Sequence, residues 1–175
     1  MKTGINITLG ELPLRYETLN ELYEASDQNF CLNPVFLPLD EDRTRAYVLA
    51  ARTGMNNGFR FLAKGIYRNR TLIGKAELTV YEDGIGEIDL LIVQNECSKG
   101  YGTRALQELI TLTEGTVCSG YSAYVREDHE AMKAVLLHNG FHKSRMFRAE
   151  VTGISGRQYQ VREVIGAEYL RGGNA

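Results

Sequence analysis

The sequence predicts an α/β protein with a mixed central sheet of about seven strands. The N-terminal half of this sheet is expected to be antiparallel, because three strand-like runs follow one another through short turns between residues 59 and 93. A strand–helix–strand crossover over residues 87–126 comes next, and such crossovers normally join parallel strands. We therefore expect a parallel strand pair at the centre of the sheet and helices on both of its faces.

Local sequence patterns place the individual elements. Alternation of apolar and polar residues indicates strands, and apolar residues three and four apart indicate helices. Thr18 and Glu21 form a capping box, and Asp40 and Asp128 are expected to cap two further helices. The expected strands are residues 5–9, 59–67, 71–81, 87–93, 121–126, 145–152 and 158–165, and the expected helices are residues 18–28, 40–52, 102–113 and 129–139.

Length and composition indicate one folded domain. The chain has 175 residues, of which 43% are hydrophobic and 24% are charged, and this composition excludes a disordered chain. A chain of this length buries a core without needing disulfides or a metal. We place the domain at residues 1–170 and expect residues 171–175 to form a flexible tail, because they are rich in glycine.

Charge and cysteine content narrow the function classes. The net charge of −2 argues against a dedicated nucleic-acid binder, which usually has a basic surplus. No apolar run is long enough to span a bilayer, and the N-terminus lacks the apolar core of a signal peptide, so no membrane partner is expected. The three cysteines form neither a C-x-x-C pair nor a zinc-finger spacing, which predicts reduced thiols in the cytoplasm and no metal.

The most informative segment is the turn that enters the helix at residues 102–113. Six residues, Gln94 to Lys99, separate the strand at 87–93 from Gly100. Gly102 follows two residues later. Glycines let the backbone approach a ligand, and the first N–H groups of a helix have no internal partner, so together they suit a pyrophosphate.

Two other interpretations of this turn stay open. It could simply start the helix, or it could be a dinucleotide-binding fingerprint, because residues 100–105 fit G-x-G-x-x-A. The fingerprint is disfavoured because its first glycine should follow the strand directly and because the preceding strand belongs to an antiparallel meander. A Walker-type phosphate loop is excluded, since G-x-x-x-x-G-K-[ST] does not occur.

The segment from Glu87 to Leu106 resembles the acetyl-CoA motif of the GNAT superfamily of N-acetyltransferases, in which Arg/Gln-x-x-Gly-x-Gly/Ala follows a strand. The strand start, Glu87-Ile88, is similar to that of the branch that acetylates protein N-termini and small amines. The helix at 129–139, which ends in Asn139-Gly140-Phe141, resembles the second conserved helix of the superfamily. The order of the elements also agrees over nearly the whole chain.

The resemblance implies acetyl-CoA as co-substrate, without a metal. The free backbone edge of the central strand would pair with pantetheine, and a backbone N–H near Leu91 or Ile92 would bind the oxyanion. The backbone N–H groups of the turn would hold the pyrophosphate. The implied CoA-binding residues are Leu91, Ile92, Val93, Ser98, Lys99, Gly100, Tyr101, Gly102 and Thr103.

Three positions depart from the superfamily pattern. Cys97 stands where the superfamily has Arg or Gln, and His129 stands where an Asn often touches CoA. Leu136 stands where many members have a Tyr that protonates the leaving thiolate. These departures keep a second interpretation open, namely a degenerate CoA-binding or regulatory module without fast catalysis.

The catalytic candidates come from two strands. Glu87, Asp89 and Leu91 share one strand face by alternation, and Glu87 is the candidate base or anchor for the amine. Asp89 is expected to form an ion pair with a basic residue of a neighbouring strand, with a catalytic role as the alternative. Tyr124, on the strand after the crossover, is the candidate acid in place of the missing tyrosine.

The predicted reaction is direct transfer of an acetyl group to a primary amine of a small molecule, a peptide or a protein N-terminus. The segment 77–96 has six acidic residues and no Lys or Arg, which favours a cationic amine. Residues 18–52 are expected to form the rim of the acceptor site. A homodimer is a candidate assembly.

Overall fold

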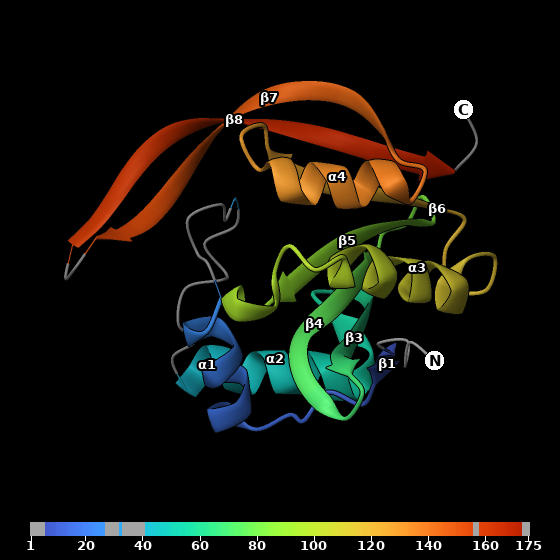
Figure 1. The fold of residues 1–175 in the computed structure, drawn as a ribbon, viewed down its shortest axis with the longest axis vertical. Helices are drawn as coiled ribbons and strands as arrows, with labels where there is room; N and C mark the ends of the chain where they lie inside the picture. The colour runs from blue at the N-terminus through green and yellow to red at the C-terminus, as the bar shows by residue number, and fades with distance from the viewer. Residues whose placement is uncertain (1–5, 27–31, 33–40, 156–157, 173–175) are drawn as a thin grey trace.

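A computed structural model describes residues 6–26, 32, 41–155 and 158–172 (Figure 1). Its elements, in chain order, are β1 (Ile7–Gly10), α1 (Tyr16–Glu24), α2 (Glu41–Thr53), β2 (Met55–Asn56), β3 (Phe59–Arg68), β4 (Thr71–Val80), β5 (Ile85–Ile92), a 3₁₀ helix (Gln94–Glu96), α3 (Tyr101–Thr113), β6 (Gly120–Arg126), α4 (Glu130–His138), β7 (His142–Ser155) and β8 (Gln158–Gly172).

The strands form one mixed sheet, and this confirms the predicted fold class. The strand order is β1-β3-β4-β5-β6-β8-β7, and the short β2 pairs with β3 outside this path. The pair β5–β6, joined by α3, is parallel, whereas the ladders from β1 to β5 and from β6 to β7 are antiparallel. The parallel pair therefore lies in the middle of the sheet, as expected from the crossover.

Helices cover both faces of this sheet. The larger core cluster contains Leu106 of α3, Leu136 of α4 and Ile88 of β5. The smaller cluster contains Leu19 of α1 and Leu91 of β5, and side chains of α2 pack against it. Because residues 88 and 91 of one strand point to opposite faces, α3 and α4 cover one face and α1 and α2 the other (Figure 1).

Two of the predicted helix caps are wrong. The helix α1 begins at Tyr16, so Thr18 lies inside its first turn, and the residue before the helix, Arg15, makes no side-chain capping bond. The N–H of Leu19 donates to the carbonyl of Arg15 at 3.0 Å, so the helix ladder already includes the residues before Thr18. The carboxylate of Asp128 forms an ion pair with Arg126 at 2.6 Å, and no side-chain cap precedes α4.

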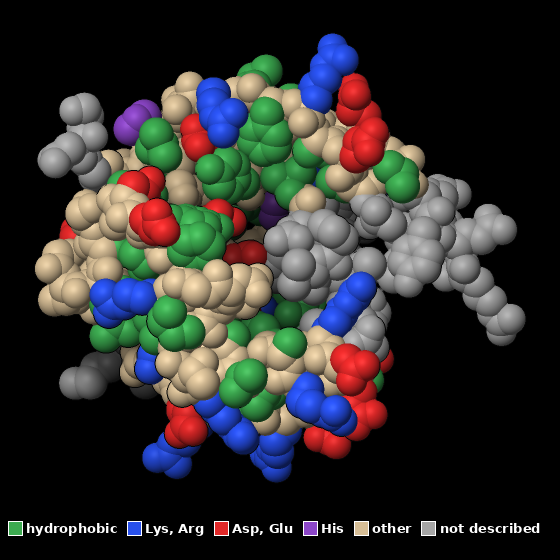
Figure 2. All heavy atoms as spheres, turned by 180° about the vertical axis from the view of Figure 1, so that it is seen from behind, with side chains coloured by type: hydrophobic (Ala, Val, Ile, Leu, Met, Phe, Trp, Pro, Cys, Tyr) green, Lys and Arg blue, Asp and Glu red, His purple; other side chains and the backbone are tan. Residues whose placement is uncertain are grey.

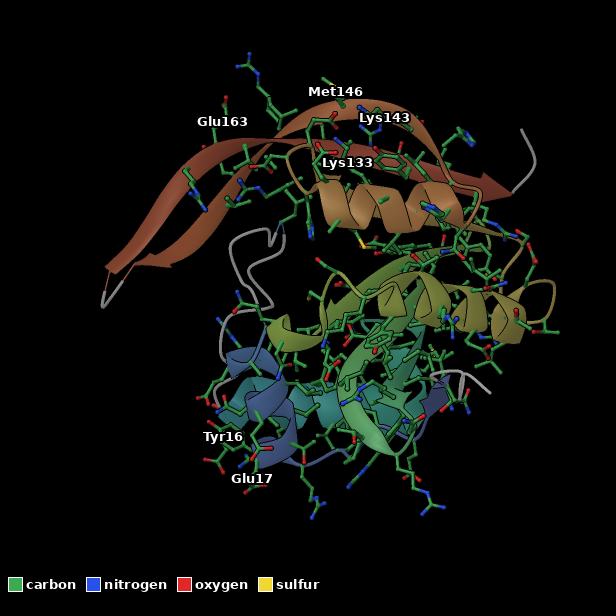
Figure 3. The ribbon with its side chains drawn as sticks, viewed as in Figure 1. Tyr16, Glu17, Lys133, Lys143, Met146 and Glu163 are labelled. Carbon is green, nitrogen blue, oxygen red and sulfur yellow. The ribbon has the colours of Figure 1, made fainter. Side chains whose placement is uncertain are left out.

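The hairpin β7–β8 is longer than the sequence predicts. Arg171, placed by the sequence in the flexible tail, pairs in β8 with Tyr121 of β6, and Gly172 pairs with Gly120. Strand β8 therefore continues to Gly172, because β6 supplies backbone partners up to that residue. Figure 3 shows the two strands curving together past α4, with Lys133 and Lys143 close to each other, and both lysines form ion pairs with Glu127.

Within the described ranges, no helix is long and apolar enough to cross a membrane.

The packing of α3 gives a first prediction. Leu106 is fully buried, whereas Leu112 of the same helix is 50% exposed. Leu106→Ala removes core contacts and leaves a cavity, so it should lower the free energy of unfolding by about 2–5 kcal/mol. The matched control Leu112→Ala should change it by less than about 0.5 kcal/mol. Urea unfolding followed by circular dichroism measures both, and equal effects would contradict the packing described here.

Candidate active site

The strands β5 and β6 separate along their length. Their parallel pairing covers three residue pairs only, and the last of these is Glu87 with Ser122. From residue 88 to residue 92, β5 pairs with β4 on one side and, among the described residues, with no strand on the other. An extended ligand can bond to such an edge like an added strand.

Backbone alternation identifies the groups on this open edge. The N–H of Val93 donates to the carbonyl of Ile73 of β4 at 2.9 Å, so by alternation the N–H of Leu91 also faces β4 and that of Ile92 faces the opening. The Leu91 carbonyl comes so near Gly74 that a Cβ there would overlap it. Because Gly74 has no side chain, β4 and β5 can lie this close together next to the opening.

The loop after β5 is fixed by hydrogen bonds and ion pairs. The N–H of Gln94 donates to the carbonyl of Ala25, at the end of α1, at 2.7 Å. The buried carboxylate of Glu96 forms ion pairs with Arg68 of β3 at 3.1 Å and with Lys99 at 3.2 Å. These contacts tie the loop to both sides of the sheet. A hollow of about 440 Å³ lies at the junction, and its lining includes Ala25, Val93, Gln94 and Asn95.

The predicted phosphate turn has the backbone form that an anion site needs. Ser98 and Gly100 have left-handed φ values of 60° and 78°, and α3 begins directly after Gly100. No side chain caps the helix, and its first backbone bond at this end is donated by Arg104 to Gly100. The N–H groups of residues 101–103 therefore precede the helix ladder and suit an anion. The six predicted residues, 98–103, form one continuous turn.

The two glycines of the turn have different roles. A Cβ on Gly100 would meet no atom within 4 Å, so its requirement is the left-handed backbone. A Cβ on Gly102 would lie 3.2 Å from Val135 of α4. The amide of Asn139 donates to the carbonyls of Thr103 at 3.1 Å and Val135 at 2.9 Å. Gly102 and Asn139 thus hold α4 against the first turn of α3.

The three departures from the superfamily pattern lie in different surroundings. The exposed thiol of Cys97 lies 3.5 Å from the carbonyl oxygen of Val93. Leu136 is fully buried in the core between α4 and the sheet, so its side chain is structural. His129 precedes the first turn of α4.

The face of β4 and β5 that α1 and α2 cover carries a buried charged cluster. Lys75, which is 2% exposed, forms an ion pair with Glu77, and Glu77 lies directly across the strands from Asp89. The phenol of Tyr47 of α2 donates to Glu77 at 2.6 Å. The Lys75 ammonium lies 5.2 Å from the ring centre of Tyr23 of α1 and 5.0 Å from that of Tyr47, within the range of cation–π contacts.

The neighbours of this cluster shift its pKa values. Burial and then the charge of Glu77 raise the pKa of Asp89 well above its usual value, although Lys75 opposes this. Burial lowers the pKa of Lys75, but the charges of Glu77 and Asp89 outweigh it and the net pKa is raised. Burial and Glu77 also raise the pKa of Tyr47. The surroundings therefore favour the charged form of Lys75 and the neutral forms of Tyr47 and Asp89.

The catalytic candidates Glu87 and Tyr124 lie on this same face, because Glu87 pairs with Ser122 and residues 122 and 124 alternate alike. Each has a side-chain partner: Tyr81 donates to Glu87 at 3.0 Å, and Tyr124 donates to Glu168 of β8 at 2.9 Å. Burial, followed by the bond to Glu168, raises the pKa of Tyr124. Burial, followed by the charge of Glu87, raises the pKa of Tyr81 to about 12.

The structure separates the six acidic residues of the segment 77–96. Glu77, Glu87 and Asp89 lie on the face described above, and Figure 2 shows acidic atoms deep in a hollow near the middle of one side of the molecule. Glu82 and Asp83 belong to the exposed turn between β4 and β5. Glu96 belongs to the loop ion pairs.

Sequence analysis missed the partners of these acids. Asp89 is expected from the sequence to pair with a basic residue of a neighbouring strand, but the ion pair of Lys75 of β4 is with Glu77, which lies directly across from Asp89. A polar alternation, Lys75 and Glu77 within an otherwise apolar strand, is the signal that could have found the pair. The contribution of Tyr47 has no such signal, since it depends on how α2 packs on the sheet.

Comparison with known proteins agrees with this geometry. The profile of the Acetyltransferase (GNAT) domain family matches residues 12–142. No curated protein sequence matches the chain.

Several solved structures share the fold. The ribosomal L7/L12 alpha-N-protein acetyltransferase RimL, in complex with coenzyme A, is 15% identical with a TM-score of 0.74, over 97% of this chain and 95% of that one. The microcin C7 self-immunity acetyltransferase MccE, in complex with acetyl-CoA and AMP, is 18% identical with a TM-score of 0.69, over 95% and 92%. An acetyltransferase from Salmonella typhimurium that modifies the N-terminal serine of L7/L12 is 14% identical with a TM-score of 0.72, over 98% and 97%.

An open strand edge beside a helix start that suits phosphate defines a CoA-dependent acyltransferase fold. The chain belongs to the GNAT acetyltransferase family, because the family profile covers most of its length. Acetyl-CoA is accordingly the co-substrate of the enzyme.

The phosphate turn gives a second prediction. Gly100→Ala forces a side chain into a left-handed position within the turn, so it should weaken CoA binding at least about tenfold. Gly115→Ala is the matched control, because Gly115 has a similar φ of 73° and similar open space beyond the far end of α3. Titration calorimetry with CoA should show a loss for Gly100→Ala and near-parental binding for Gly115→Ala and Cys97→Ala. Parental binding by all three variants would make the turn purely structural.

Proposed function

We propose that this protein transfers the acetyl group of acetyl-CoA to a primary amine by direct attack. The single observation that carries the proposal is the separation of β5 from β6 beyond Glu87 and Ser122, directly beside the turn that starts α3. The separation offers a strand edge for an extended ligand arm, and the turn offers N–H groups for its phosphates. The face of β4 and β5 that carries Glu77, Glu87 and Asp89 borders this edge.

The residues of the open edge fit acetyl-CoA. The backbone of Leu91, Ile92 and Val93 would hold the pantetheine arm, and residues 98–103 would hold the pyrophosphate. The Ile92 N–H, which faces the opening by alternation, would stabilise negative charge on the carbonyl oxygen under attack. Bound acetyl-CoA supplies a thioester carbonyl there.

The acceptor is proposed to reach the thioester over the face that carries Glu87 and Tyr124. Glu87, whose carboxylate already accepts a bond from Tyr81, would bind an ammonium group of the incoming acceptor before that group moves along the strand to the thioester. Tyr124 would protonate the leaving sulfur, because its phenol lies on this face and carries a proton at neutral pH. The core position of Leu136 leaves this role open to another side chain.

The proposed acceptor is a cationic amine, in particular a peptide or protein N-terminus or a small polyamine. Support comes from the carboxylates of Glu77, Glu87 and Asp89, which share one face of the sheet. Two of the structural neighbours act on a ribosomal protein. We also propose a cytoplasmic location, because the described cysteines, Cys97 and Cys118, are free thiols, which a reducing compartment preserves. The homodimer stays a prediction.

Two measurements test the proposal in sequence. Calorimetry with acetyl-CoA comes first, and absence of binding at millimolar ligand would overturn it. Thiol release is then followed with three acceptors: a peptide with N-terminal serine, spermidine and an aminoglycoside. Release with any of them supports acetyl transfer, whereas tight binding without release across the panel supports the CoA-binding module without catalysis.

The roles of Glu87 and Tyr124 give a third prediction. Glu87→Gln removes the charge that meets the ammonium, so kcat/KM for spermidine should fall about tenfold or more. Tyr124→Phe should cost less than about tenfold, because a thiolate leaves readily and the general acid contributes little. Steady-state thiol release on both variants measures this. A larger loss for Tyr124→Phe than for Glu87→Gln would contradict the assignment.

A further inference from the structure

We propose that Asp89 accepts the proton of the acceptor ammonium, and that the buried Lys75–Glu77 ion pair sets the pH at which it can do so. This inference rests on the proposed function and assigns a proton acceptor within the same site. It concerns the Lys75–Glu77 ion pair, to which the proposed function gives no part in proton transfer.

Asp89 and Glu87 differ in their distance along β5 from Leu91, beside which the thioester is proposed to lie. A strand rises about 3.3 Å per residue, so Asp89 lies about 7 Å from Leu91 along the strand, and Glu87 about 13 Å. A general base must reach its proton directly or through one water. With the thioester beside Leu91 and Ile92, the side chain of Asp89 spans this distance with one water, and that of Glu87 does not.

Asp89 also lies in the part of β5 that opens. The last pair between β5 and β6 is Glu87 with Ser122, so Asp89 is the first acidic residue beyond it. It keeps partial contact with solvent, and its carboxylate accepts a bond from the N–H of Leu90, which faces the opening. Glu87 lies at the closed end, where Tyr81 donates to it.

Among the described residues, the ionisable groups around Asp89 come from five elements. On β4, Glu77 lies directly opposite and opposes ionisation of Asp89, whereas Lys75 favours it. On β5 itself, Glu87 opposes ionisation. Tyr23 of α1 and Tyr47 of α2 flank Lys75, and Tyr124 of β6 shares the face. These three phenols are neutral, because the pKa of each is raised.

The proposed step balances as follows. The Asp89 carboxylate takes one proton from the ammonium group and so leaves a neutral amine. The nitrogen lone pair forms the C–N bond with the acetyl carbon as the C–S bond breaks, and the electron pair of that bond leaves on sulfur. Tyr124 gives its proton to this sulfur and is reprotonated by the second proton of the nitrogen, and Asp89 returns the first proton to solvent.

The sign of the pH dependence follows from the charges. Asp89 must be ionised to act, so activity falls as the pH falls through its pKa. Glu77→Gln removes a neighbouring negative charge and should lower this pKa, while the amide oxygen still accepts the bond from Tyr47. Lys75→Met removes a neighbouring positive charge and should raise it. The two substitutions should therefore move the acidic limb of the activity profile in opposite directions.

Two readouts test the proposal. The first is kcat/KM against pH for acetyl-CoA with the N-terminal serine peptide or, if that is inactive, spermidine. The second is a ¹³C NMR titration of aspartate carboxyl groups in the protein without ligand. In both, Glu77→Gln should lower the midpoint by about one pH unit and Lys75→Met should raise it by a similar amount. The charge-matched control Glu108→Gln, on an exposed position of α3, should leave both midpoints unchanged.

Loss of function at Asp89 completes the test. Asp89→Asn should lower kcat by about 100-fold or more while CoA affinity by calorimetry stays parental. Parental kcat for Asp89→Asn, or midpoints that stay in place in both the Glu77 and Lys75 variants, would overturn the inference. If the parent protein binds acetyl-CoA but acetylates none of the three amines, the proposed function fails first, and the NMR titration still reports whether the ion pair controls Asp89.

Discussion

The early end of the β5–β6 pairing is the constraint on which the rest of the site depends. Two parallel strands joined by a helix would ordinarily continue side by side, but here the ladder stops after three pairs. Hydrogen-bonding groups on an unpaired edge need partners, so the edge favours a ligand with an extended backbone. Because the loop from the same strand leads into α3, the anion-binding turn lies at the end of that edge.

Contacts on both sides keep the opening in place. On one side, Asn139 and the close approach of Val135 to Gly102 hold α4 against the first turn of α3. On the other, the backbone of Gln94 bonds to Ala25 at the end of α1, and the carboxylate of Glu96 bridges two basic side chains. The site is therefore built from ordinary packing and hydrogen bonding of two helix ends.

The buried charges of β4 add a second constraint. An ion pair such as Lys75–Glu77 stabilises a fold little, since removing both charges from water costs about as much as their attraction returns. Its retention in an apolar strand thus calls for a reason other than stability. Control of a neighbouring carboxyl group supplies one, because electrostatic interactions are strong where water is scarce.

Sequence patterns predicted the features that are local in the chain and missed those that depend on register. The turn from Ser98 to Thr103 is continuous, so glycine spacing and the following helix revealed it. The parallel centre of the sheet followed from the crossover. The meeting of Glu77 with Asp89 depends on strand pairing across a turn, and that of Tyr47 with Glu77 depends on helix packing. The capping box at Thr18 failed because the backbone bond from Leu19 to Arg15 extends the helix past it toward the N-terminus.

The long hairpin β7–β8 has a consequence for motion. Its inner half, from Gly166 onward in β8, is hydrogen-bonded to β6. In its outer half, before Ile165, the described residues pair only between β7 and β8. A two-stranded ribbon is marginal in water, so this half should open locally at a small fraction of the free energy that unfolds the sheet. Amide hydrogens there should exchange with solvent early, and Figure 1 shows the hairpin extending beyond the sheet on the side where α1 lies. The same two strands thus combine an inner part as stable as the sheet with an outer part that can open without it.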